Sequence, residues 1–227
     1  MPQRLKDWLA IGKNMAVNER ISENDLIYKA SAVWYMHFGK AALDFVLKTI
    51  KKAGKKELQN ILDLPCWHGR ELRFFKAHFP EAKIFACDIG KDGVDFCAET
   101  FGVEGIYSQQ DLQLISIPYQ FDLIWCGSLL THLDKKYWRD FLQFFCEHLY
   151  KNGILIFSTH GNFVIEKFSL VKVDLGIDEI IKKKLLEQYD QPGFSYGDYS
   201  GHLNYGISLS SKKEFVILFQ KAGVYNF

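Results

Sequence analysis

One short stretch, residues 61–70, constrains the fold of this chain more than any other part of it. It opens with an apolar run that is typical of a buried strand, and Pro65 begins a turn that closes at Gly69. A helix is predicted to begin directly after the turn, at Glu71. A strand, a tight turn and a helix in this order indicate one unit of an open parallel sheet.

Asp63 is the one carboxylate of that apolar run, and it lies near the carboxyl end of the predicted strand. In an open parallel sheet, ligands bind in the crevice beyond the carboxyl ends of the strands. A helix that starts after the turn directs its free N–H groups into the same crevice. We therefore expect Asp63 and the turn at residues 65–69 to face one small ligand.

The rest of the chain continues the alternation of strands and helices. Strands are predicted at residues 60–64, 83–87, 105–108, 121–126 and 154–158. Helices are predicted at residues 25–29, 31–49, 71–77, 92–101, 134–150, 177–188 and 210–222, with a C-cap turn at 152–153 and an aromatic, glycine-rich loop at 194–205. The predicted N-caps are Ser22 or Asn24, Asp92, and Ser210 or Ser211. This pattern predicts an α/β fold: a Rossmann-like open, mainly parallel sheet with helices on both faces.

Composition narrows the classes of partner. The formal net charge of +1 gives no reason to expect nucleic acid, and no apolar run approaches the ~20 residues of a membrane span. Five cysteines without a CxxC pair indicate reduced thiols and a cytoplasmic location. The seven histidines are too scattered to predict a metal site. We expect a monomer or a homodimer.

The stretch at residues 61–70 resembles the first motif of the class I S-adenosylmethionine-dependent methyltransferases. That motif runs hydrophobic-Leu-Asp-Leu-Gly-Cys-Gly-x-Gly-Arg, and the matching residues here are Asp63, Cys66, Gly69 and Arg70. Pro65 and Trp67 stand where the family usually has glycine. Glycine permits unusual dihedrals and close backbone approach to a ligand. A tryptophan at position 67 could instead stack on the ligand or block its pocket.

The spacing of later residues supports the resemblance. Asp88 follows a predicted strand, nineteen positions after Gly69, where an acid would accept hydrogen bonds from ribose hydroxyls. A turn-forming or capping role is the alternative for Asp88. If Asp88 binds the ribose, Ile89 would lie against the adenine. The resemblance places Asp111 near the adenine amino group. The implied S-adenosylmethionine site comprises Asp63, Pro65, Cys66, Trp67, His68, Gly69, Arg70, Asp88, Ile89, Asp111, Leu112, Cys126 and Tyr35.

The amino-terminal region also resembles the family. The segment Tyr35-Met-His-Phe-Gly39 resembles a pattern of a bacterial branch that is often found with surface-polysaccharide or other small-molecule modification. In that branch the region covers the cofactor, so Tyr28 and Tyr35 are candidate lid residues. Helix packing is the alternative for both tyrosines.

The resemblance also implies how the chain is organised and what it does. We expect one domain over residues 1–227: a helical cap (1–50), a cofactor-binding core (58–160), a substrate-side insert (161–209), and a final helix with a partial strand (210–227). The expected reaction is methyl transfer to a small-molecule or sugar acceptor at oxygen. A hydroxyl acceptor is served by a general base, and His132 and His160 lie beyond the fourth and fifth strands. A structural role is the alternative for each histidine.

Two other functions remain open. Family members normally end with two more strands, and only five residues follow Ala222, so the last strands are expected to be truncated or missing. Together with Trp67, this suggests a degenerate methyltransferase fold that binds a ligand or protein without turnover. A nicotinamide-dependent dehydrogenase fits less well, because its fingerprint needs three glycines where this loop has one.

Overall fold

The computed structural model describes residues 16–170, 177–189 and 193–213. The chain divides into two compact units. Unit 1 comprises Met1–Trp125 and His148–Ile156, and unit 2 comprises Cys126–Glu147 and Phe157–Phe227. Within the described ranges, no helix is long and apolar enough to cross a membrane.

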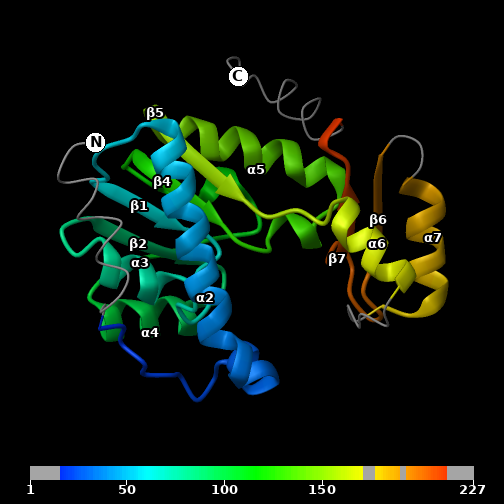
Figure 1. The fold of residues 1–227 in the computed structure, drawn as a ribbon, viewed down its shortest axis with the longest axis horizontal. Helices are drawn as coiled ribbons and strands as arrows, with labels where there is room; N and C mark the ends of the chain where they lie inside the picture. The colour runs from blue at the N-terminus through cyan, green and yellow to red at the C-terminus, as the bar shows by residue number, and fades with distance from the viewer. Residues whose placement is uncertain (1–15, 171–176, 190–192, 214–227) are drawn as a thin grey trace. The chain divides into compact units, whose positions relative to one another are not determined.

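A five-stranded sheet forms the centre of unit 1 (Figure 1). Its strands are β1 (Asn60–Asp63), β2 (Lys83–Asp88), β3 (Glu104–Tyr107), β4 (Phe121–Cys126) and β5 (Leu149–Phe157), in the order β3-β2-β1-β4-β5. Strand β1 pairs in parallel with both β2 and β4, and β2 pairs in parallel with β3. The predicted Rossmann-like open parallel sheet is therefore confirmed.

The strand order reverses direction at β1, because β2 follows on one side of it and β4 lies on the other. This is the topological switch point of the sheet, where ligands bind in open α/β folds. Asp63, the last residue of β1, pairs with Ala86 on one side and Trp125 on the other. The fold therefore places Asp63 at the expected ligand crevice.

Three helices complete the described part of unit 1: α2 (Leu26–Ala53), α3 (Leu72–His78) and α4 (Lys91–Phe101). Helix α4 packs on β2 and β3, α3 packs on β2, and α2 packs on α3. Burial of their apolar faces is the main stabilising contribution. The shared core includes Val46, Ile50, Ile61, Leu72, Phe75, Ile84, Val94, Cys97 and Leu123.

Several predicted boundaries at helix ends were wrong. The predicted break between the helices at 25–29 and 31–49 is observed as a kink in α2, where Ser31 has non-helical backbone. The N-cap was predicted wrongly: it is Asp25, whose carboxylate accepts from the backbone N–H of Ile27 and Tyr28. Neither Ser22 nor Asn24 has this role, since Asp25 is the residue with extended backbone directly before the first turn. Gly90, and not Asp92, is the N-cap residue of α4.

The start of β5 was also predicted wrongly. Helix α5 (Lys135–Glu147) ends before the predicted boundary, and β5 already begins at Leu149. The predicted C-cap turn at residues 152–153 lies inside this strand, with Asn152 at a left-handed φ of 66°. Gly153 has a packing role there, since a Cβ would lie 2.8 Å from the carbonyl oxygen of Phe121.

Unit 2 contains α5, α6 (Asn162–Leu170), α7 (Glu179–Tyr189) and the hairpin of β6 (Phe194–Asp198) and β7 (Gly206–Ser210). The hairpin corrects the prediction of a loop at 194–205, and α6 was not predicted. Ile207 and Leu209 pack with Leu185 of α7 in a small core. Ser210 ends β7 and so does not cap the helix predicted at 210–222, and residues 214–222 of that prediction lie outside the described residues.

Asp122 fastens the start of β4 to the linker before β1. Its Oδ2 accepts from the backbone N–H of Gln59 at 2.8 Å and of Asn60 at 3.1 Å, and its Oδ1 pairs with Lys55 at 2.8 Å. Burial alone would raise the pKa of Asp122, but these contacts outweigh it and lower the pKa.

We expect Asp122→Asn to lower the free energy of unfolding by roughly 1 kcal/mol at pH 7, because a charged acceptor is lost. A folded-state pKa below the unfolded value means that this stability is present above pH ~4 and is lost as the pH falls. Urea melts of both proteins at pH 7 and pH 3 measure the difference. A difference that is as large at pH 3 as at pH 7 would contradict the assignment.

Candidate functional site

Asp63 is the most unusual residue of unit 1. Its side chain is 1% exposed, and neither carboxylate oxygen has a hydrogen-bond partner among the described residues. Burial raises the pKa of Asp63 well above its usual range, and the nearby carboxylate of Glu71 raises it further, while Arg70 opposes them. Burying a carboxylate without donors is costly unless a ligand supplies them. A cationic donor group is the ligand chemistry that fits.

The turn after β1 keeps the backbone of a glycine loop despite its substitutions. Trp67 has φ 45° and Gly69 has φ 76°, both in the left-handed region. Trp67 thus adopts a conformation that a glycine at this position would adopt without strain. Its indole is partly buried, and Nε1 donates to Asp25 at 3.1 Å.

Asp88 holds this turn in place. Its Oδ2 accepts from the backbone N–H of Trp67 and its Oδ1 from that of Gly90, each at 2.8 Å. The carboxylate therefore joins the turn to the start of α4. Each carboxylate oxygen has a further lone pair, so these bonds leave capacity for a ligand hydroxyl.

Helices α2 and α4 approach the same turn through glycines. A Cβ on Gly39 of α2 would lie 2.3 Å from the carbonyl oxygen of Arg70. A Cβ on Gly93 of α4 would lie 2.4 Å from that of Trp67. Both helices therefore pack directly on the backbone of the turn.

Glu71 is a site residue that the sequence analysis missed. It exerts the largest charge effect on Asp63, and its Oε1 accepts from Arg70 Nε at 2.7 Å. Arg70 is also close enough to lower the pKa of Asp63. Two carboxylates and one guanidinium around the end of β1 suit a ligand that carries both an ammonium and a carboxylate group.

The other predicted cofactor residues of unit 1 differ in exposure. Ile89 is 58% exposed at the end of β2, and Pro65 is partly buried. Asp111 is exposed and caps the short 3-10 helix η2 (Leu112–Leu114) through the backbone N–H of Gln113. Tyr35 is buried, and its hydroxyl donates to Asp25 at 2.6 Å, which is a packing position.

Three further predicted residues are buried. Cys66 belongs to the turn, and a hydrogen bond with Cys97 and burial raise the pKa of its thiol. His68 pairs through Nε2 with Asp92 at 2.8 Å, and its Nδ1 has no partner among the described residues. Cys126 ends β4. Its place beside an acceptor stays a prediction.

The two candidate bases lie together in unit 2. His132 Nδ1 is 3.0 Å from the carbonyl oxygen of Gly206 and 3.0 Å from the Tyr199 hydroxyl. Since a carbonyl only accepts, Nδ1 carries the proton and Nε2 keeps its lone pair. Burial lowers the pKa of His132, and burial together with the charge of His132 lowers the pKa of His160. The ring of Tyr205 stacks on His132 at 5.1 Å.

A buried arginine connects the segment before α2 to the turn. Arg73 is 1% exposed, and its guanidinium donates to the carbonyl oxygens of Asn18 and Arg20 at 3.1 Å and of Gly69 at 3.0 Å. It also lies 5.2 Å from the centre of the Tyr35 ring. Arg73 therefore joins the backbone of the segment before α2 to the backbone of the turn.

We expect Arg73→Met to lower the free energy of unfolding by roughly 2–4 kcal/mol, because three hydrogen bonds from a buried, charged donor are lost. Arg139→Met is the matched control: Arg139 is 61% exposed and its ion pair within the described ranges is with exposed Asp140, so a change within about 0.5 kcal/mol is expected. Chemical denaturation of both variants measures the effect. Equal midpoints for the two would show that Arg73 has no such role.

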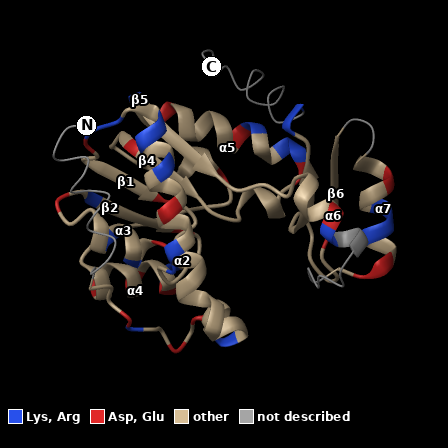
Figure 2. Ribbon diagram, viewed as in Figure 1, with Lys and Arg blue, Asp and Glu red and all other residues tan. Residues whose placement is uncertain are grey.

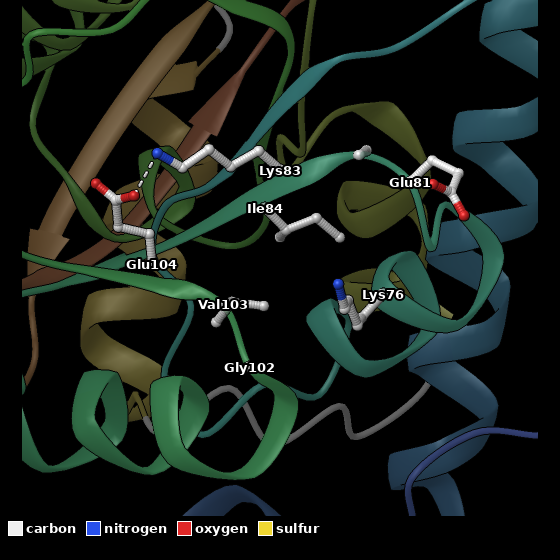
Figure 3. A pocket seen from close by; sticks show the side chains of 8 residues that line it. Lys76, Glu81, Lys83, Ile84, Gly102, Val103 and Glu104 are labelled. Atoms are coloured by element: carbon white, nitrogen blue, oxygen red, sulfur yellow. Dashed lines mark ion pairs between the residues drawn. The ribbon is translucent and has the colours of Figure 1, made fainter.

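Unit 1 also has a cavity of about 480 Å³ at the opposite ends of the strands (Figure 3). Lys83 at the start of β2 and Glu104 at the start of β3 form an ion pair on its wall. The other lining residues are Lys76, Glu81, Ala82, Ile84, Gly102 and Val103. Charges of both signs are interspersed along the described ribbon (Figure 2). This cavity lies at the amino ends of the strands, so it is separate from the Asp63 site.

The sheet order and the buried acids at the ends of β1 and β2 define a class I methyltransferase fold. Residues 62–155 match the family model of a methyltransferase domain. Among curated proteins, none matches the sequence.

Solved structures show the same fold. An S-adenosylmethionine-dependent methyltransferase from Clostridium acetobutylicum is 16% identical, with 87% of each chain covered and a TM-score of 0.57. An O-methyltransferase family protein from Burkholderia thailandensis is 14% identical, with 98% of this chain and 62% of that chain covered and a TM-score of 0.50. At these identities the likeness establishes the fold.

Proposed function

We propose that this protein is an S-adenosylmethionine-dependent methyltransferase that acts on a hydroxyl of a small molecule or sugar. The observation that carries the proposal is the pair of buried Asp63 oxygens at the switch point of the sheet, which have no hydrogen-bond partner in residues 16–170, 177–189 and 193–213. The methionine part of S-adenosylmethionine carries an ammonium and a carboxylate, which matches the two acids and one guanidinium found there.

The residues of unit 1 have separate roles in this proposal. Asp63 and Glu71 take the ammonium group, and Arg70 takes the carboxylate. Asp88 accepts from the ribose hydroxyls through its remaining lone pairs. When bound, the cofactor supplies a methyl group on a positively charged sulfur, which is a good leaving group. The chain then contributes mainly by alignment, which can be worth effective molarities of ~10⁵ M or more.

His132 is the proposed general base. Its Nδ1 proton is held by the Gly206 carbonyl, so Nε2 can accept the proton of the acceptor hydroxyl. Its lowered pKa keeps the ring neutral at pH 7. His160 is the second candidate, and its buried Nδ1 has no partner among the described residues.

Calorimetric titration of the full chain with S-adenosylmethionine and S-adenosylhomocysteine, with NADH as the control, tests the proposal. We expect micromolar affinity for the first two ligands and no heat with NADH. Binding of NADH alone would replace the proposal with a dehydrogenase.

A non-catalytic methyltransferase fold is the second candidate, and Trp67 at a glycine position favours it. Such a module would release no S-adenosylhomocysteine with any sugar or phenolic acceptor. Failure of the full chain to bind S-adenosylmethionine at all would make this second candidate the leading one.

A further inference from the structure

We propose that Asp25 is a positioning residue that holds the cofactor loop through the side chain of Trp67. The cofactor loop is defined here as residues 65–70, and residues 18–25 before α2 are called the strap. The role deepens the proposed function and rests on it, because it explains how the loop is held ready for S-adenosylmethionine. The sequence analysis did not place Asp25 or the strap at the cofactor site.

The contacts of Asp25 exceed those of an ordinary helix cap. Oδ1 accepts from the backbone N–H of Ile27 and of Tyr28, each at 3.0 Å, which is the capping interaction. The same oxygen accepts from Trp67 Nε1 at 3.1 Å, and Oδ2 accepts from the Tyr35 hydroxyl at 2.6 Å. Asp25 is 0% exposed. A serine would suffice as a cap, so the buried carboxylate serves the two additional donors.

The hydrogen bond to Asp25 comes from the side chain of Trp67, which is itself a residue of the cofactor loop. Its backbone lies in the left-handed region, which is unfavourable for a residue with a side chain. Its main-chain N–H donates to Asp88 and its indole N–H donates to Asp25. The side chain that a glycine would lack is therefore the group that ties the loop to α2. The loss of glycine's conformational freedom is offset by an additional anchor.

The strap contacts the loop and its flanking helices at further points. Asn24 Nδ2 donates to Asp92 Oδ1 at 3.1 Å, and His68 contacts Asp92 Oδ2 at 2.8 Å. Asn18 Nδ2 donates to the carbonyl oxygen of Thr100 at 3.1 Å, near the end of α4. Arg73 bonds the strap carbonyls and the loop carbonyl of Gly69 with one guanidinium. These contacts fix the loop before a ligand arrives, which reduces the ordering cost of binding.

Hydrogen exchange of the ligand-free protein tests the positioning directly. Asp25→Ser keeps a capping oxygen but is too short to bond both Trp67 and Tyr35, and Trp67→Phe removes the indole N–H but keeps an aromatic ring. We expect amide exchange in residues 64–71 to accelerate at least 10-fold in both variants. The matched control is Trp138→Phe, which loses an indole bond to the Leu130 carbonyl in unit 2 and should leave residues 64–71 unchanged. Unchanged exchange in Trp67→Phe would overturn the proposal.

Titration with S-adenosylmethionine tests the consequence for binding. We expect Asp25→Ser and Trp67→Phe each to raise the Kd about 5-fold to 10-fold, and the double variant to raise it no further, because both remove one link. Trp138→Phe should lose thermal stability with an unchanged Kd. Multiplied effects in the double variant would overturn the proposal. If the wild-type chain binds no S-adenosylmethionine, the proposed function fails, and the exchange rates alone decide whether Asp25 positions the loop.

Discussion

Asp63→Ala is expected to raise the Kd for S-adenosylmethionine by roughly 100-fold or more, which corresponds to ~3 kcal/mol. The reason is that Asp63 is buried with no donor in the part of the chain that the structure describes, so the ammonium group of a ligand would be its main partner. A charge-assisted hydrogen bond in a site shielded from water is among the strongest single contacts. Calorimetric titration of the purified variant measures the change.

The buried carboxylate of Asp63 should also lower the free energy of unfolding of the ligand-free protein at pH 7, compared with the Asp63→Asn variant. Since the folded-state pKa of Asp63 is raised by burial, the carboxylate disfavours folding once the pH exceeds its unfolded pKa of ~4. Asp63→Asn removes this cost, so its thermal midpoint without ligand should rise at pH 7. The gain should shrink as the pH is lowered towards 4.

Asp122→Asn provides the matched control for both measurements. It is the same substitution as Asp63→Asn and lies in the same unit, but Asp122 already has backbone donors and a lysine partner. It should lose stability and leave the Kd unchanged. Micromolar binding retained by Asp63→Ala would remove Asp63 from the site, whatever the melting data show.

His132→Ala is expected to lower kcat by roughly 10²-fold to 10⁴-fold, the usual contribution of a general base, with an unchanged Kd for S-adenosylmethionine. The geometry that leads to this expectation is the fixed tautomer, with Nε2 unprotonated. A lowered pKa keeps the base form present below pH 6.5, so the acid limb of the wild-type rate profile should lie below that value. Release of S-adenosylhomocysteine across a pH series measures both.

His160→Ala separates the two candidate bases in the same assay. A larger fall in kcat than for His132→Ala would assign the base to His160. Tyr199→Phe removes the hydroxyl that contacts His132 Nδ1 but keeps the Gly206 contact, so its effect should be much smaller. Unchanged turnover of His132→Ala on the true acceptor would dismiss His132 as the base.

The parallel sheet was predictable because its signals are local. Strand β4 is nearly all apolar, as a central strand must be, and its predicted bounds match the observed ones. The turn after β1 carries its own markers in Pro65 and Gly69. The hairpin at residues 194–210 was missed because glycine and polar residues interrupt its alternation. Its pairing becomes evident only when Ile207 and Leu209 are placed against α7.

The site was predictable to the extent that its residues follow strand ends. Asp63 and Asp88 could be found in this way, and both lie where the strands end. Glu71 was missed because its effect on Asp63 depends on how the start of α3 approaches β1 in space. Asp25 had a usable signal, an acid directly before an apolar helix, but Ser22 and Asn24 offered the same type of cap nearby.

Two glycines of α2 and α4 have a consequence for natural variation. Gly39 and Gly93 occupy ordinary helical positions, where alanine would normally be the better helix former. Here any side chain would displace the carbonyl groups of Arg70 or Trp67. Related sequences that keep this loop should therefore vary freely around both positions and not at them. The two glycines should thus serve as markers for recognising relatives whose loop has diverged.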